Sequence, residues 1–149
     1  MSVKTWILMT FITLASSACR TETYFGINED MTPDSKFEKV LVQEANAALS
    51  QAFPPGKTTF YFPHKDEKFA TDLELKLRKE GYAVITAKAT TRDPKGITEI
   101  GYKLGSVGGD KDLIVLRVVA GEAWQMSRVY QRQKDGTVRT SGPLLIRKG

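Results

Sequence analysis

Hydrophobic residues recur every three or four positions over two stretches of the chain, as in helices that bury one face. In the first stretch, Asp34 or Ser35 is placed to cap a helix, and the Pro-Pro pair at 54–55 ends it. In the second, Asp66 is the expected cap and Gly81 stands where a left-handed residue closes a helix. The apolar positions are Phe37, Val40, Leu41, Ala45, Ala48, Leu49 and Ala52, and then Phe69, Ala70, Leu73 and Leu77. Two amphipathic helices are predicted.

The rest of the chain has the pattern of strands. The expected strands are 58–62, 82–87, 100–104, 113–120, 124–131 and a final one over 138–148. Residues 105–111 are expected to form a turn, and Asp135-Gly136 indicates a hairpin. Pro143 places part of the final strand at a sheet edge. The fold class is therefore α+β, a two-layer sandwich of two helices on a mostly antiparallel sheet of about six strands.

The first nineteen residues have a different pattern. Lys4 is the only charge before an apolar run over 6–15, and small residues at 16–18 precede Cys19. Such a run is too short to span a bilayer and is typical of a signal peptide over residues 1–18. A cysteine after small residues predicts a bacterial lipoprotein with acyl chains such as palmitate on Cys19, although Ser16 stands where Leu is usual. The alternative is ordinary cleavage after Ala18, which leaves a soluble periplasmic protein.

Residues 19–33 are polar and without period, as in a flexible tether between the lipidated cysteine and a domain over 34–149. Fourteen extended residues, 20–33, reach about 45 Å at roughly 3.3 Å per residue. Such a tether would hold the folded part well off the membrane.

Composition narrows the chemistry. The 149 residues are 41% hydrophobic and 26% charged, which fits one globular domain and neither a disordered chain nor a polytopic membrane protein. One Cys and one His argue against zinc, iron–sulfur and disulfide chemistry, so no metal and no cofactor are expected. The net charge of +5 names no partner by itself.

We find no convincing catalytic group. His64 is interpreted as a solvated loop residue, and Glu67 and Glu80 as surface residues. Asp72 and Glu74 are the carboxylates that a cell-wall hydrolase would need, but two residues apart on a helix they point to different sides. The expectation is that the protein is not an enzyme and has no small-molecule substrate.

Two groups are candidates for partner binding. Trp124, Met126, Arg128 and Tyr130 share one strand face and form either core or a docking patch. Arg128, Arg132, Lys134 and Arg139 cluster near the hairpin, as a solvated surface or as a rim for an acidic partner or phospholipid headgroups. Leu75 lies off the helix stripe, so it belongs to a wide apolar face or contacts something outside the domain.

From Ala52 onward the chain carries a series of short segments in a fixed order. They are Phe53-Pro54-Pro55 with Thr58 and Phe60, Leu73 with Leu77-Arg78, Gly81-Tyr82-Ala83-Val84, Tyr102, Leu116-Arg117-Val118, Ser127-Arg128-Val129-Tyr130 and Ile146-Arg147-Lys148. In these segments the chain resembles TrbH, a family of conjugal transfer lipoproteins from plasmid mating-pair-formation operons. The family has no catalytic residues to carry over.

The resemblance implies a lipid-anchored component of a conjugative type IV secretion apparatus, on the periplasmic face of the outer membrane. Its implied partners are the other channel subunits and, through acylated Cys19, the membrane lipid. Direct contact with nucleic acid is not expected. The alternative function is a surface-exclusion or pilotin-like lipoprotein that binds one partner.

Overall fold

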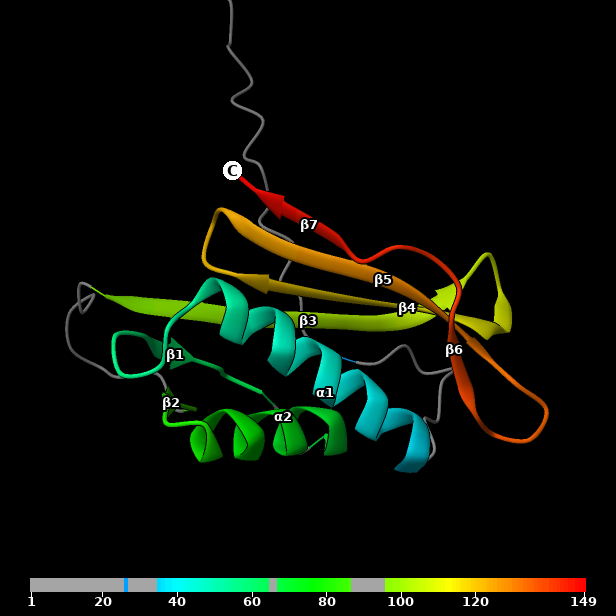
Figure 1. Cartoon of the computed structure of the whole chain (residues 1–149), viewed down its shortest axis with the longest axis horizontal. Helices are drawn as coiled ribbons and strands as arrows, with labels where there is room; N and C mark the ends of the chain where they lie inside the picture. The colour runs from blue at the N-terminus through cyan, green and yellow to red at the C-terminus, as the bar shows by residue number, and fades with distance from the viewer. Residues whose placement is uncertain (1–25, 27–34, 65–66, 87–95) are drawn as a thin grey trace, which may run out of the picture.

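The computed structural model describes residue 26 and residues 35–64, 67–86 and 96–149 (Figure 1). The elements in chain order are α1 (Ser35–Ala52), β1 (Thr59–Tyr61), α2 (Lys68–Lys79), β2 (Ala83–Ile85), β3 (Ile97–Val107), β4 (Asp110–Ala120), β5 (Trp124–Arg132), β6 (Val138–Thr140) and β7 (Leu145–Lys148). Two helices lie on one side of a seven-stranded sheet, so the predicted α+β sandwich is confirmed.

The sheet has a parallel part and an antiparallel part. Its strand order is β2-β1-β3-β4-β5-β6, and β7 pairs with β5 beside β6. Strand β1 runs parallel to both β2 and β3, and α2 connects β1 to β2. The pairs from β3 onward are antiparallel, and β3, β4 and β5 are the long strands. These three strands form the central platform of the molecule.

The helix ends follow the local sequence closely. Helix α1 begins at Ser35 and stops before Pro54, which has no N–H to continue the ladder. Helix α2 ends in a Schellman motif, in which Gly81 N–H donates to Arg78 O and Tyr82 N–H donates to Leu77 O. Gly81 has φ +92°, as predicted for that position. The expected caps Asp34 and Asp66 lie outside the described residues, and Glu67 at the N-cap of α2 makes no side-chain cap bond.

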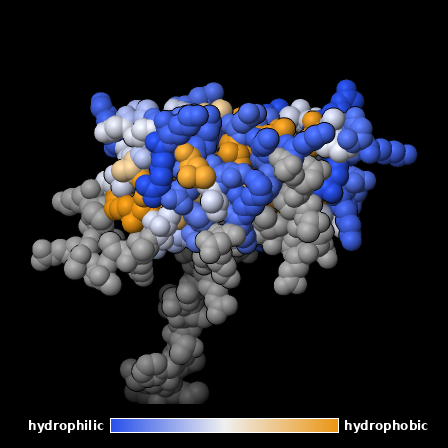
Figure 2. Space-filling view, turned by 90° about the horizontal axis from the view of Figure 1, so that it is seen from below, coloured by the Kyte–Doolittle hydropathy of each residue, from blue (hydrophilic) through white to orange (hydrophobic). Residues whose placement is uncertain are grey.

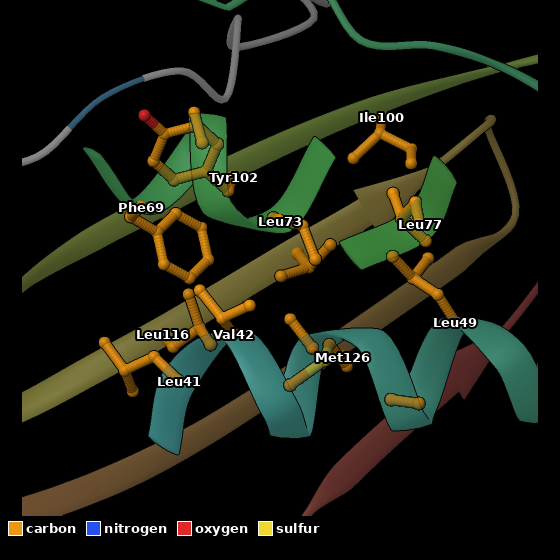
Figure 3. Packing of buried hydrophobic residues seen from close by; sticks show 14 of the residues in the cluster. Leu41, Val42, Leu49, Phe69, Leu73, Leu77, Ile100, Tyr102, Leu116 and Met126 are labelled. Atoms are coloured by element: carbon orange, nitrogen blue, oxygen red, sulfur yellow. The ribbon is translucent and has the colours of Figure 1, made fainter. Parts of the chain in front are cut away.

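The core lies between the helices and one face of the sheet. Figure 3 shows side chains of α1, α2 and the sheet meeting in one cluster, with Leu49, Leu73, Leu116 and Met126 among them. In β3, β4 and β5, the even-numbered residues carry the large apolar side chains of this cluster. Every buried hydrophobic residue of the described part lies between Phe37 and Tyr130. A polypeptide of residues 20–149 therefore contains the whole described core.

Two predicted boundaries are wrong. Strand β3 continues to Val107 and β4 starts at Asp110, so the expected turn over 105–111 shrinks to Gly108-Gly109. Both glycines have positive φ, +61° and +82°, the backbone that a two-residue hairpin needs. The predicted final strand is two short strands, because residues 141–144 with Pro143 separate β6 from β7.

Gly26 lies at the free edge of β3. The Leu104 N–H donates to the Gly26 carbonyl oxygen at 3.2 Å. The rest of the predicted tether, and Cys19 with residues 1–18, lie outside the described residues. From Cys19 to Gly26 the chain is seven residue steps long, which is about 23 Å at roughly 3.3 Å per residue when extended. The reach predicted from the full tether was about twice as long.

Candidate functional site

The aromatic face of β5 belongs to the core. Trp124 is 6% exposed, and Met126 and Tyr130 are fully buried. The Phe53 ring packs edge-on against Trp124 at 5.8 Å, and the Phe37 ring packs against Tyr130 at 6.4 Å. The prediction of an exposed docking patch is corrected in favour of the core alternative, because residues of α1 and Phe53, just after it, pack against these side chains.

Arg128, the fourth candidate on this strand, is half-buried and bridges the two layers. Its Nη1 donates to Glu44 Oε2 on α1 at 3.1 Å, and the Tyr130 hydroxyl donates to the same oxygen at 2.5 Å. Burial, with the Glu44 carboxylate beside it, raises the pKa of Tyr130 well above its ordinary value of 10. The three groups hold α1 in register on β5 and are not a free binding site.

The expected basic rim near the hairpin is divided. Arg128 is engaged by Glu44, and the Arg132 guanidinium lies over the Phe37 ring, 5.4 Å from its centre. Lys134 and Arg139 are exposed. The four residues therefore do not form one surface.

His64 is also part of the structure, which corrects its interpretation as a solvated loop residue. Its side chain is 7% exposed, packs at a tilt against the Phe62 ring, and lies with Nε2 2.8 Å from Glu74 Oε2. Arg78 donates to Glu74 Oε1 at 2.7 Å and to the Val84 carbonyl at 2.6 Å. Burial acts to raise the pKa of Glu74, but the hydrogen bonds from Arg78 and His64 lower it overall. This cluster joins the end of β1 to α2 and β2.

The remaining acidic candidates have structural partners as well. Asp72 pairs with Lys68 one turn away, whereas Glu74 faces His64, so the two carboxylates do not share a site. Glu67 and Glu80, expected on the surface, are half-buried.

Each of these two glutamates joins separate parts of the fold. Glu67 accepts a hydrogen bond from the Tyr102 hydroxyl. Glu80 accepts from Ser50 at 2.8 Å and from Asn46 at 2.7 Å, which joins α2 to α1. Burial, reinforced by Glu67, raises the pKa of Tyr102 above 10.

Neither a metal centre nor a membrane helix appears in the described ranges. Within residues 26, 35–64, 67–86 and 96–149, no group of three or more His, Cys, Asp and Glu side chains could hold a metal ion. No helix of these ranges is long and apolar enough to cross a membrane.

The helix side of the molecule has little exposed apolar surface. Figure 2 shows the side carrying α2 and β2, where hydrophilic residues surround small hydrophobic areas. Leu75 is 60% exposed and lines a shallow groove with Val42 of α1, bordered by Lys39, Lys76 and Lys79. Leu75 is therefore not part of a wide buried face.

The second face of the sheet is covered by neither helix. It presents the paired odd-numbered residues of β3, β4, β5, β6 and β7, because β-strand side chains alternate and the even positions face the core. Its basic side chains, Lys103, Arg117, Arg139 and Arg147, are all exposed. We call this surface the open face. The local sequence patterns did not predict this face, although Arg117 between apolar residues of a core strand was the available signal.

Strand β7 borders the open face and is exposed at each of its residues. Leu145 is 62% exposed and Ile146 is 41% exposed. Leu145 shares the open face with Arg147, because they pair with Ser127 and Gln125 of β5. Leu145 and Ile146 therefore give the sheet an exposed apolar edge at β7.

Comparison with known proteins gives one match. No curated protein and no solved structure matches the chain significantly. The family model of the conjugal transfer protein TrbH matches residues 20–149, which is most of the chain. The chain therefore belongs to the TrbH family of conjugal transfer proteins and has a role in conjugal transfer.

Proposed function

We propose that this chain is a lipid-anchored structural component of the type IV secretion apparatus that forms mating pairs for plasmid transfer. Acyl chains on Cys19 hold it at the periplasmic face of the outer membrane, where it binds other channel subunits. It is not an enzyme; its contribution is to bind the other channel subunits and to position them at the membrane.

The family match carries this proposal. It begins at residue 20, directly after Cys19, so the family region includes the polar segment and the domain but not the apolar run over 6–15. This division is expected for a lipoprotein, whose signal peptide is removed at the cysteine. It supports anchorage by a lipid directly before the matched region.

The contacts of the titratable groups also support a binding role. Glu44, Glu67, Glu74 and Glu80 all bond to side chains of other elements, as described above. Groups used in this way stabilise the arrangement of helices on the sheet. We therefore attribute function to the exposed surface of the domain, as expected for a subunit that binds other proteins in an assembly.

Plasmid transfer from a donor that lacks the gene is the direct test of this role. Donors complemented with the intact gene, with Cys19→Ser or with the matched substitution Thr23→Ser are compared for transfer frequency and for the cell fraction that holds the protein. We expect Cys19→Ser to leave the outer membrane and to lower transfer, whereas Thr23→Ser behaves as the intact chain. Normal transfer from the donor without the gene would refute the proposal.

Expression in the recipient separates the alternative function. A surface-exclusion lipoprotein lowers the acceptance of plasmid by a recipient that expresses it alone, whereas a channel subunit acts in the donor. Chemical crosslinking in donor membranes then identifies the channel subunits in contact. Lowered acceptance together with unaffected donors would favour the alternative.

A further inference from the structure

We propose that the open face of the sheet docks flat on an anionic phospholipid surface. The inference rests on the proposed lipid anchor for its setting, and on the charge, shape and position of the open face for its chemistry.

The charge of the open face has one dominant sign. The paired strand residues on this face include four exposed basic side chains, Lys103, Arg117, Arg139 and Arg147, and one acidic side chain, Glu99. Basic groups near an anionic bilayer each contribute about 1 kcal/mol to binding, or about five-fold in affinity. The charges are spread over four strands rather than collected around a pocket, which suits a broad surface.

Two of these charges lie where folding alone would not favour them. Lys103 and Arg117 are direct cross-strand partners in β3 and β4, and both are exposed. Like charges at directly opposite positions destabilise a sheet. An anionic surface over this pair would remove that repulsion and turn both residues into contacts.

Apolar side chains accompany the basic ones. Leu145 is 62% exposed and lies in the same cross-strand row as Arg117, with Ser127 between them. Val115 and Val119 are half-buried on the same face. Surfaces that bind the bilayer interface combine apolar side chains, which enter the headgroup region, with basic ones that contact phosphate. The row of Arg117 and Leu145 has this composition.

The chain length outside the described domain favours a membrane as the occupant. Gly26 contacts Leu104 at the edge of β3, so a lipid on Cys19 lies at most about 23 Å away along the chain. The open face extends from β3 to β7 over three strand spacings, about 14 Å at roughly 4.8 Å each. The anchor thus holds the face within reach of the bilayer, where even weak affinity produces contact.

Vesicle binding tests the open face without the anchor. The polypeptide of residues 20–149, which contains the core but no Cys19, is sedimented with vesicles of phosphatidylcholine alone or mixed with phosphatidylglycerol. We expect binding only to the mixed vesicles, and weaker binding as salt is raised. The triple variant K103Q/R117Q/R147Q should bind on the order of a hundred-fold more weakly, from about five-fold for each charge. L145S should weaken binding about ten-fold, because it removes one inserted apolar side chain.

The matched control is K39Q/K57Q/K79Q, which removes the same charge from exposed positions away from the open face. It should bind within a few-fold of the parent polypeptide. Equal loss in the two triple variants would show that net charge alone acts, and would overturn the proposal. So would absence of binding by the parent. If the open-face variant then lowered plasmid transfer, the occupant would be a protein.

Failure of this proposal and failure of the proposed function are distinguishable. The polypeptide has no site for acylation, so vesicle binding reports on the open face alone. An unacylated Cys19 in cells would refute the anchor and leave the vesicle result standing.

Discussion

The two faces of the sheet are made from alternate residues of the same strands, yet they differ in almost every property. The face under the helices carries Tyr102, Leu116 and Met126, all 1% exposed or less. The open face carries Lys103 and Arg117 between small or half-buried neighbours. The first face accounts for the fold, because it removes most of the large apolar side chains from water. The second leaves its basic side chains in contact with solvent, so substitutions of these side chains should change stability little.

This difference shows that residue type alone does not predict a binding surface when it is unknown which face of the sheet the residue lies on. Trp124, Met126 and Tyr130 attract attention as interface residues, and the structure places them in the core. Arg117 interrupts an apolar strand and looks like an irregularity, but it lies at the centre of the open face.

Truncation of neighbouring residues in β4 should give the largest contrast. Leu116→Ala removes a fully buried side chain and should lower the free energy of unfolding by about 3 kcal/mol, whereas Val115→Ala on the open face should cost about 1 kcal/mol or less. Urea denaturation of the polypeptide of residues 20–149 measures both. Equal losses would mean that the open face is buried as deeply as the core.

Alkaline pH should weaken the helix-covered face through its two buried tyrosines. Their pKa values are raised in the native state, so above pH 10 the unfolded chain releases phenolic protons that the native chain keeps. Stability is therefore complete below pH 10 and should fall by about 1.4 kcal/mol per tyrosine by about pH 11.

The variants Tyr102→Phe and Tyr130→Phe separate the contributions of the two tyrosines. Each should remove about half of the difference in unfolding free energy between pH 9 and pH 11. A loss that neither variant reduces would contradict the burial of these hydroxyls.

Acid should weaken the contact between the helices. The hydrogen bond from Ser50, opposed by partial burial and aided by Asn46 and Lys76, holds the pKa of Glu80 below its ordinary value of 4.5. A carboxyl group with a lowered native pKa stabilises the fold fully above its ordinary pKa of 4.5. This stabilisation disappears as the pH falls through the native pKa. Glu80→Gln should therefore be less stable at neutral pH and should lose less stability on acidification. Parallel pH profiles for the two proteins would contradict this role.

The smallest expected change in stability is a gain rather than a loss. Lys103→Glu places opposite charges at the cross-strand pair with Arg117 and should stabilise the sheet by about 0.5 kcal/mol. The same substitution should weaken binding to anionic vesicles. Lys57→Glu, which lies outside the sheet, serves as the control for net charge. If the Lys103→Glu variant were more stable and still bound anionic vesicles fully, the like-charge pair would have no role in membrane binding.

The helices and long strands could be predicted from local sequence signals. The pairing of the strands and the partners of the buried polar side chains could not, because they depend on contacts between distant residues. The three-to-four periodicity, Pro54 and Gly81 located both helices, and alternation located the long strands. The parallel pairing of β1 with β2 and β3 had no local signal, because it depends on which strands meet after folding. His64 and Glu80 looked like surface residues because their partners, Glu74 and Ser50, lie 10 and 30 positions away.

The candidate site was less predictable than the fold. The sequence showed basic residues near the hairpin, but Arg128 and Arg132 turn inward, whereas Lys103, Arg117 and Arg147 collect on the open face through cross-strand register. Register is a property of the assembled sheet, since one shifted residue would exchange the two faces.

The mass of the protein extracted from donor membranes tests the central claim of lipid anchorage most directly. We predict a chain that begins at Cys19 and carries acyl groups on that residue, recovered with the outer membrane. An unacylated chain found in the soluble periplasmic fraction would contradict the account.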